Sequence, residues 1–270
     1  MLGNSWRLID TGPLDGPANM AIDEALLACF DPEQTAPVLR LYGWNPPALS
    51  LGRFQDAAAV LDLPRCRSEG LPVVRRITGG GVIYHADELT YSIVCAPHHL
   101  PSGSTIKESF RTLTSFLLLF YRGLGLSAAY AADLPEDRVR LGERTAFCFA
   151  GREAFDILID GRKIGGNAQR RLKGAVFQHG SIPLRDRLAH GLACLNEQPS
   201  GLEEGVTSLE CSGCALGDEE LRERLAAAFA AALGVDLVAG DLTAGERERA
   251  AELASGKYAA DSWNLDGVET

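Results

Sequence analysis

The sequence predicts an α+β fold in which mixed or antiparallel β-sheets pack against helices. Two observations predict it: a meander of short β-branched runs and tight turns near the middle of the chain, and a long amphipathic helix before it. A chain of 270 residues can bury a sizeable core. The simplest organisation is one domain over residues 1–270, with residues 216–270 as a helical C-terminal extension of it.

The first elements are a strand and a helix. Trp6–Ile9 is a short apolar run typical of a strand. Apolar residues recur at helical spacing over residues 18–30, with Asn19 as a suitable N-cap. Asp23 then falls in the first turns, where the helix dipole favours negative charge.

A glycine turn follows the next clear strand, which covers residues 72–77. Three glycines at 79–81 predict a tight turn whose backbone N–H groups can point at an anion, although a plain turn has the same signature. Residues 82–94 are β-rich throughout and predict one long or bent strand. His85 lies inside it, where a structural role is more common than a catalytic one.

Two helices are predicted from their periodicity and their ends. Residues 105–124 carry apolar side chains at helical spacing, and Gly123 and Gly125 end the run. Residues 243–255 form another helix, with Glu246 at the fourth place of a capping box.

The central meander spans residues 157–183. Ile157–Ile159 is followed by Asp160-Gly161, a strong signal for a tight hairpin, and a second turn is expected at Lys173-Gly174. The Gly165-Gly166 pair lies between these turns. Glycine inside a strand usually marks a bulge or a close approach by another backbone. We therefore expect a three-stranded meander with a glycine-lined middle strand.

Charge limits the classes of partner. The formal net charge is −10, from 26 basic and 36 acidic residues. Proteins that bind nucleic acid or anionic membranes usually present basic surfaces, so neither partner is expected. A local basic patch forms an exception and comprises Arg162, Lys163, Arg170, Arg171 and Lys173. It is either a site for an acidic partner or anionic ligand, or an ordinary solvated strand face.

Seven cysteines without a small-scaffold pattern are typical of free thiols in a reducing cytoplasm. Cys211 and Cys214 form a single C-x-x-C pair that no second pair completes, so we expect ordinary thiols and no metal site. The first residues lack the features of a signal peptide, and the longest bulky apolar run is too short to span a bilayer. A cytoplasmic location is expected.

Several motifs in this order resemble the biotin/lipoate protein ligase superfamily, from about Trp6 to Trp263. They are NMAIDEAL from Asn19, YGWNPPALSLGRFQ from Tyr42, RRITGGG from Arg75 with His85 after it, GRKIGGNAQ from Gly161, and QHGSI from Gln178. Within the superfamily, Cys148-Phe149 ahead of DGRK at 160–163 resembles the octanoyltransferases of the LipM type. ELTYS from Glu88 and the terminal KYAADSWN resemble the same branch.

The resemblance implies the lipoate–protein ligase catalytic-domain fold and octanoyl transfer without a cofactor. The donor would be acyl carrier protein, and the acceptor a lysine on a lipoyl-accepting domain such as the glycine-cleavage H protein or a dehydrogenase E2. Cys148 would be the nucleophile and Lys163 its partner, because a neighbouring ammonium favours the reactive thiolate. The resemblance implies substrate binding by Arg75, Gly79, Gly80, Gly81, His85, Gly165, Asn167, Ala168, His179 and Gly180.

Other interpretations stay open at this point. Cys148, flanked by phenylalanines, also suits a small buried hydrophobe, and Lys163 suits a surface charge beside a turn. Gly81 and Ala86 stand where transferases of this superfamily usually carry arginine and aspartate. They keep an ATP-dependent lipoate–protein ligase as an alternative. An amidotransferase that moves octanoyl between lipoyl domains and a non-catalytic binding subunit are further alternatives.

Overall fold

The computed structural model describes residues 4–101, 105–135, 153–172, 174–197 and 202–269. A six-stranded mixed sheet forms its centre, in the order β10-β11-β6-β2-β1-β13. These strands are β1 (Ser5–Leu14), β2 (Val38–Trp44), β6 (Glu88–Cys95), β10 (Gly166–Leu172), β11 (Ala175–Pro183) and β13 (Asp236–Ala239). β1 runs parallel to β2 and β13, and the remaining pairs are antiparallel.

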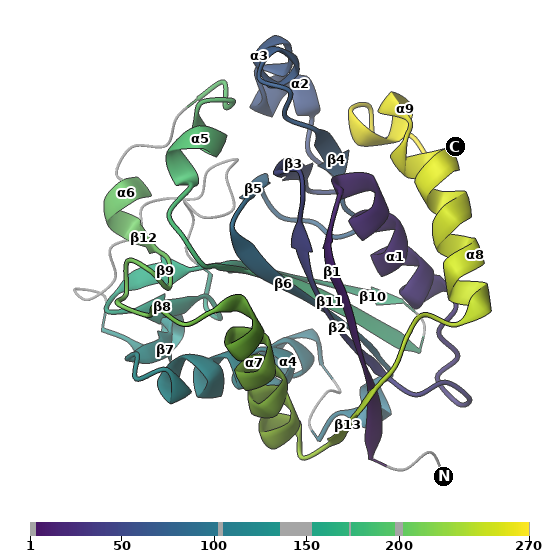
Figure 1. Ribbon diagram of the computed structural model, residues 1–270, viewed down its shortest axis with the longest axis vertical. Coiled ribbons are helices and arrows are strands. Elements are labelled where there is room, and N and C mark those ends of the chain that lie inside the picture. Colours follow the sequence, from purple (N-terminus) through teal and green to yellow (C-terminus); the bar gives the residue numbers. More distant parts are fainter. Residues whose placement is uncertain (1–3, 102–104, 136–152, 173, 198–201, 270) are drawn as a thin grey trace.

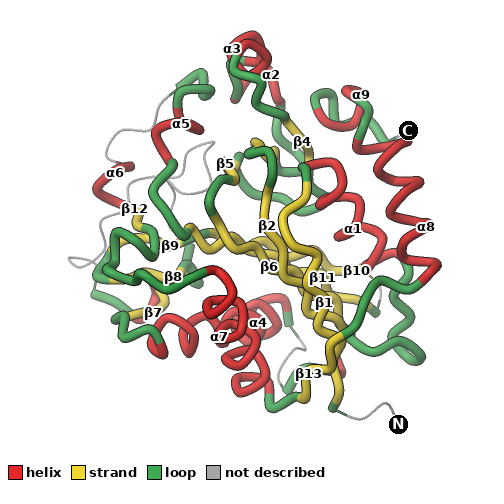
Figure 2. The backbone as a smooth tube through the Cα atoms, viewed as in Figure 1, coloured by secondary structure: helices red, strands yellow, loops and turns green. Residues whose placement is uncertain are grey.

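Helices cover both faces of this sheet (Figures 1 and 2). α1 (Gly16–Ala28) and α8 (Ala244–Leu253) pack on one face, and α4 (Ile106–Gly123) and α7 (Asp218–Leu233) on the other. Successive residues of a strand point to opposite faces, so Leu39 and Leu41 of β2 join the core under α4, while Val38 and Tyr42 join the core under α1. β2 is therefore buried along its whole length.

Two smaller sheets flank the centre. β12-β9-β8-β7 contains β7 (Ala128–Tyr130), β8 (Ile157–Ile159), β9 (Arg162–Ile164) and β12 (Val206–Thr207). β4-β3-β5 contains β3 (Ala48–Leu51), β4 (Val73–Arg75) and β5 (Ile83–His85). The remaining short helices are α2 (Ala57–Val60), α3 (Leu63–Ser68), α5 (Leu188–Leu192), α6 (Leu202–Gly205) and α9 (Asp261–Asn264).

The first predicted hairpin is confirmed, but the three-stranded meander is wrong. β8 and β9 pair across Asp160-Gly161, both at positive φ (50° and 80°) as a tight hairpin turn requires. The predicted middle strand divides at Gly165 into β9 and β10, which belong to different sheets. Gly165 has φ 70°, and a Cβ there would lie 1.9 Å from the carbonyl oxygen of Ser181. A close backbone approach explains this glycine, and it separates the two sheets.

The strand predicted over residues 82–94 is likewise two strands. β5 joins the three-stranded sheet and β6 the six-stranded one. The chain turns between them at Asp87, which has φ 45°. β-propensity alone favours extended backbone on both sides of this turn, so it did not reveal the break.

Helix α1 begins earlier than predicted. Asp15, not Asn19, is the N-cap, and its side chain accepts a hydrogen bond from the N–H of Ala18. Asn19 is buried inside the helix, where its side chain donates to the carbonyls of Leu14 and Gly43. Asp23 consequently lies well beyond the first turn, and its partner is an arginine instead of the helix dipole.

The helix ends predicted downstream are confirmed. Thr105 caps α4 in a capping box with Glu108, and Thr243 with Glu246 does the same for α8.

The C-terminal segment, residues 216–270, contributes β13 to the central sheet, α7 to one face of it and α8 to the other. Whether it is a separate extension stays a prediction. No helix in the described ranges combines the length and apolarity needed to cross a membrane.

Candidate functional site

A small pocket opens where α1, the three-stranded sheet and the central sheet meet. Its apolar walls come from Met20, Tyr42, Trp44, Ile83 and Ala168. Its polar and glycine lining comes from Ser50, Arg76, His85, Thr90, Gly166, Asn167, His179, Gly180 and Ser181. The pocket therefore has the narrow, largely apolar character that suits an acyl chain.

Glu88 at the start of β6 holds one wall of this pocket. Its carboxylate lies 2.7 Å from His85 Nδ1 and accepts a 2.6 Å hydrogen bond from Ser181 Oγ. His85 Nε2 lies 2.7 Å from Ser50 Oγ, and the imidazole stacks on Trp44 at 3.9 Å. Burial raises the pKa of Glu88, but His85 and the hydroxyl donors outweigh burial and bring it below its ordinary value. The carboxylate is therefore charged at neutral pH and fixes the imidazole.

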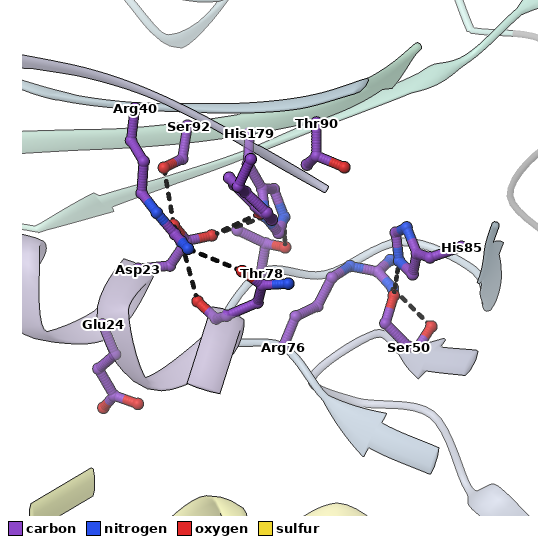
Figure 3. A network of polar contacts seen from close by, with 12 residues as sticks. Asp23, Glu24, Arg40, Ser50, Arg76, Thr78, His85, Thr90, Ser92 and His179 are labelled. Atoms are coloured by element: carbon purple, nitrogen blue, oxygen red, sulfur yellow. Dashed lines mark hydrogen bonds and ion pairs between the residues drawn. The ribbon is translucent and has the colours of Figure 1, made fainter. Parts of the chain in front are cut away.

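Asp23 organises a second network beneath the pocket (Figure 3). Its carboxylate accepts hydrogen bonds from Arg40 at 2.7 Å, Tyr42 at 2.9 Å and Ser92 at 2.7 Å. His179 Nδ1 lies 3.6 Å away. Burial raises the pKa of Asp23, but Arg40 and His179 lower it by more, so the net shift is downward.

Arg76 connects the glycine turn to β3, and its contact with Ser50 is drawn in Figure 3. Its guanidinium donates to the carbonyls of Gly79 at 2.9 Å and Gly81 at 2.7 Å, and also to the Ser50 carbonyl. Thr78 at the start of the turn hydrogen-bonds His179 Nε2 at 2.7 Å. Burial lowers the pKa of His179, so this imidazole is neutral near pH 7.

Arg75 points away from the pocket and connects the C-terminal segment to residues 52–55, which pack against the glycine turn. Its guanidinium donates to the carbonyls of Trp263 and Leu265 and to three carbonyls of residues 52–55. Gly52 in turn abuts the glycine turn, because a Cβ there would lie 1.9 Å from the carbonyl oxygen of Gly80. Arg75 thus holds the backbone behind the pocket instead of lining it.

Lys163 is buried on β9, with 2% of its side chain exposed, and forms a 2.9 Å ion pair with Asp156. Asp156 also accepts a hydrogen bond from the backbone N–H of Glu153. Burial raises the pKa of Asp156, and Lys163 opposes that rise without cancelling it. A surface-charge role for Lys163 is therefore excluded by its burial.

The segment Gly166–Ala168 opens β10, which stands at the edge of the central sheet. Asn167 accepts a 2.7 Å hydrogen bond from the Tyr91 hydroxyl through its side-chain oxygen. An edge strand keeps one row of N–H groups without a partner strand in the described sheet. Gly166, Asn167 and Ala168 of this strand line the pocket.

The structure brings together only part of the predicted set. His85, Asn167, Ala168, His179 and Gly180 line the pocket. Gly79, Gly80 and Gly81 do not line it and touch it only through Arg76, Gly165 lies between the two sheets, and Arg75 points elsewhere. Cys148 lies outside the described residues. The predicted basic patch is divided, since Arg162 and Lys163 belong to β9 while Arg170 and Arg171 belong to β10.

Sequence reasoning missed Arg76, Glu88 and Asp156 as site residues. Alternation along the strand distinguishes Arg76 from Arg75, but a sequence alone does not say which face meets the pocket. Asp156 stands seven positions before Lys163, and the hairpin between them was the available signal.

Cys211 and Cys214 are free thiols, and no group of metal-ligating side chains occurs in the part of the chain that the structure describes.

Comparison with known proteins gives consistent relatives. A family model described as the lipoyl protein ligase A/B catalytic domain matches residues 15–230. A protein of Symbiobacterium thermophilum named Octanoyltransferase LipM is 39% identical, covering 97% of this chain and 98% of its own. A lipoate-protein ligase A solved with ATP has a TM-score of 0.82 at 27% identity, covering 98% of this chain and all of its own.

A second solved structure, a bi-partite lipoate protein ligase from Thermoplasma acidophilum described with its E2 lipoyl domain, has a TM-score of 0.81. It is 26% identical and covers 98% of both chains. The predicted α+β architecture, with mixed sheets packed against helices, is confirmed.

Proposed function

The chain belongs to the lipoyl protein ligase A/B catalytic domain family and is an acyltransferase, and from this premise we propose octanoyl transfer in lipoate biosynthesis. The donor is octanoyl-acyl carrier protein. The acceptor is a lysine of a lipoyl domain, such as H protein or a dehydrogenase E2, and the reaction takes place in the cytoplasm. The near-full-length relationship to a protein named Octanoyltransferase LipM carries this proposal.

The pocket beside α1 takes the octanoyl chain. Met20, Trp44 and Ile83 give its walls an apolar surface, and the carboxylate of Glu88 holds His85 in place at one side. Each methylene removed from water contributes about 0.8 kcal/mol, so an eight-carbon chain gains substantial binding energy in such a slot.

Cys148 and Lys163 perform the chemistry. The Cys148 thiolate attacks the donor thioester carbonyl, a new C–S bond forms, and the carrier's C–S bond breaks. The Lys163 ammonium stabilises the thiolate and protonates the leaving carrier thiol. The acceptor amine then attacks the enzyme thioester, an amide forms, and the C–S bond to Cys148 breaks. The proton lost by the amine passes to Lys163, which the first step left neutral, so the thiolate and the ammonium are restored. Thioester exchange is close to energetically neutral, so the first step requires no ATP.

Two features of the described structure support these roles. Asp156 holds Lys163 in a buried ion pair, which fixes the position of the ammonium. Gly166, Asn167 and Ala168 open the edge strand β10 and line the pocket, where their backbone N–H groups serve as donors to the oxyanion of each tetrahedral intermediate.

Intact-mass spectrometry tests the thioester. The protein incubated with octanoyl-carrier protein and no ATP gains one octanoyl group, and hydroxylamine removes it. Cys148→Ala forms no adduct, whereas Cys29→Ala, which removes an exposed free thiol at the end of α1, forms it normally. An adduct on Cys148→Ala, or transfer that continues without Cys148, contradicts the proposed intermediate.

An ATP-dependent lipoate–protein ligase is the second candidate, and the structural match to a ligase solved with ATP favours it. It predicts that acceptor modification requires ATP and free acid and survives Cys148→Ala. An amidotransferase between lipoyl domains predicts the Cys148 adduct from octanoyl-H protein but not from octanoyl-carrier protein. A pure binding subunit forms no adduct from any donor.

A further inference from the structure

A second cavity of about 90 Å³ lies on the other side of β5 from the acyl pocket. It is bounded by β5, β9, the end of β11, β12 and the segment leading into α5. Its apolar lining comes from Tyr84, Ala86, Pro183, Leu188 and Val206. We call it the arginine groove, because Arg162, Arg185 and Arg187 also line it.

The arginine groove and the acyl pocket share a thin wall. Along β5, Ile83 and His85 face the pocket, while Tyr84 faces the groove. Glu88 lines the groove, yet its carboxylate holds His85 and Ser181, which both line the pocket. A ligand in the groove therefore lies next to the acyl site without occupying it.

The charges of the groove favour an anion. Arg185 and Arg187 pair with Asp87 at 3.5 and 2.6 Å, but all three side chains are at least a third exposed, so these pairs are weak. The guanidinium of Arg162 forms no hydrogen bond or ion pair within the described residues. Arg162 directly precedes Lys163 on β9. Two carboxylates, Glu88 and Asp186, also line the groove, and Glu88 is already bound to His85 and Ser181. Such a cluster stands out in a chain of net charge −10.

We propose that the arginine groove binds the phosphate-bearing part of the phosphopantetheine arm of the octanoyl donor, while the thioester end of the arm crosses the wall to place the octanoyl chain in the acyl pocket. The arm is a long uncharged chain with a single phosphodiester, which matches an apolar groove with an arginine rim. Guanidinium groups bind phosphate through paired N–H donors, and Arg162 is the principal phosphate ligand because its guanidinium has no side-chain partner among the residues that the structure describes. This proposal rests on the proposed function, since that function supplies a donor carrying such an arm.

Steady-state kinetics with three donors tests the groove. The donors are octanoyl-carrier protein, octanoyl-coenzyme A, which has the arm's phosphate but no carrier, and S-octanoyl-N-acetylcysteamine, which has neither. Arg162→Gln raises KM about tenfold or more for the first two and leaves KM for the third unchanged. Arg249→Gln, an exposed arginine on α8 paired with Glu252, changes none of the three.

The other outcomes contradict the proposal in distinct ways. An effect confined to octanoyl-carrier protein means that Arg162 contacts the carrier's surface. An equal effect on all three donors means that Arg162 acts on the chemical step or the fold. If no thioester is turned over, the proposed function fails separately. Binding of 4′-phosphopantetheine alone, weakened about tenfold by Arg162→Gln, then supports the groove, and absence of binding overturns it.

Discussion

Two buried acid–base pairs in this molecule have similar geometry and opposite electrostatics. Asp23 and Arg40 lie 2.7 Å apart, and Asp156 and Lys163 lie 2.9 Å apart. The pKa of Asp23 falls below its ordinary value because burial is outweighed by Arg40 and its other partners. The pKa of Asp156 rises because burial outweighs Lys163.

The surroundings of each pair explain the difference. Asp23 also accepts hydrogen bonds from Tyr42 and Ser92, and Arg40 donates further to Asn19 and Thr11. That network compensates both charges, and arginine never gives up its proton in proteins. Among the described residues, Asp156 accepts hydrogen bonds from fewer donors than Asp23 does. Lysine, unlike arginine, is able to exchange its proton. We infer that the first pair holds the scaffold and that the second serves proton transfer.

The largest expected effect is on the second pair. Lys163→Met removes the cation that the proposed chemistry uses, so transfer falls about 10²–10⁴-fold, the range for loss of a general acid–base group. Single-turnover acyl transfer measures it, with Lys107→Met, an exposed lysine on α4, as the control. Near-normal turnover by Lys163→Met contradicts a role in proton transfer.

The next effect breaks the first pair. Arg40→Met leaves the Asp23 carboxylate buried without its cation, so the free energy of unfolding falls by about 3–5 kcal/mol in urea titrations. Lys163→Met costs less stability, because Asp156 has a raised pKa and takes a proton more readily. Equal losses of stability in the two variants contradict the division into scaffold pair and proton-transfer pair. Adding Asp23→Leu to Arg40→Met recovers part of the loss.

The sequence predicted the parts of both pairs that depend on local signals. The Asp160-Gly161 hairpin places Lys163 on a strand, and the α1 periodicity places Asp23 on a helix. The partners of Asp23 come from β2, β6 and β11, segments that meet only after folding. Neither spacing nor propensity reports such meetings.

Sheet membership was the other feature that local signals did not reveal. The divisions at Gly165 and Asp87 assign extended segments to different sheets, and both halves of each remain extended. A pattern of period two is the same in either sheet. The neighbouring arginines 75 and 76 show the same limit, because the chain presents them to opposite surroundings.

A smaller effect on rate separates charge from shape in the second pair. Asp156→Asn keeps the side-chain volume and an acceptor for the Lys163 ammonium, but it removes the carboxylate. The loss of fixed positioning lowers transfer about tenfold, well short of Lys163→Met. Asp133→Asn, an exposed aspartate in the segment after β7, is the matched control. A loss as large as that of Lys163→Met means that the carboxylate itself takes part in the chemistry.

The smallest effect, the pH dependence of stability, tests the opposite pKa changes of the two carboxyls directly. A carboxyl with a lowered folded pKa, such as Asp23, contributes stability above its ordinary value near 3.8 that is lost as pH falls through the folded pKa. A carboxyl with a raised folded pKa, such as Asp156, contributes stability below that value that is lost as pH rises through the folded pKa. Urea titrations between pH 3 and pH 7, a range of roughly four pH units around these values, therefore show different changes in slope. Asp23→Asn flattens the acid limb, whereas Asp156→Asn removes a loss of stability at higher pH. The same change of slope in both variants means that the pKa values of the two carboxyls move in the same direction on folding, and the contrast between the pairs is then wrong.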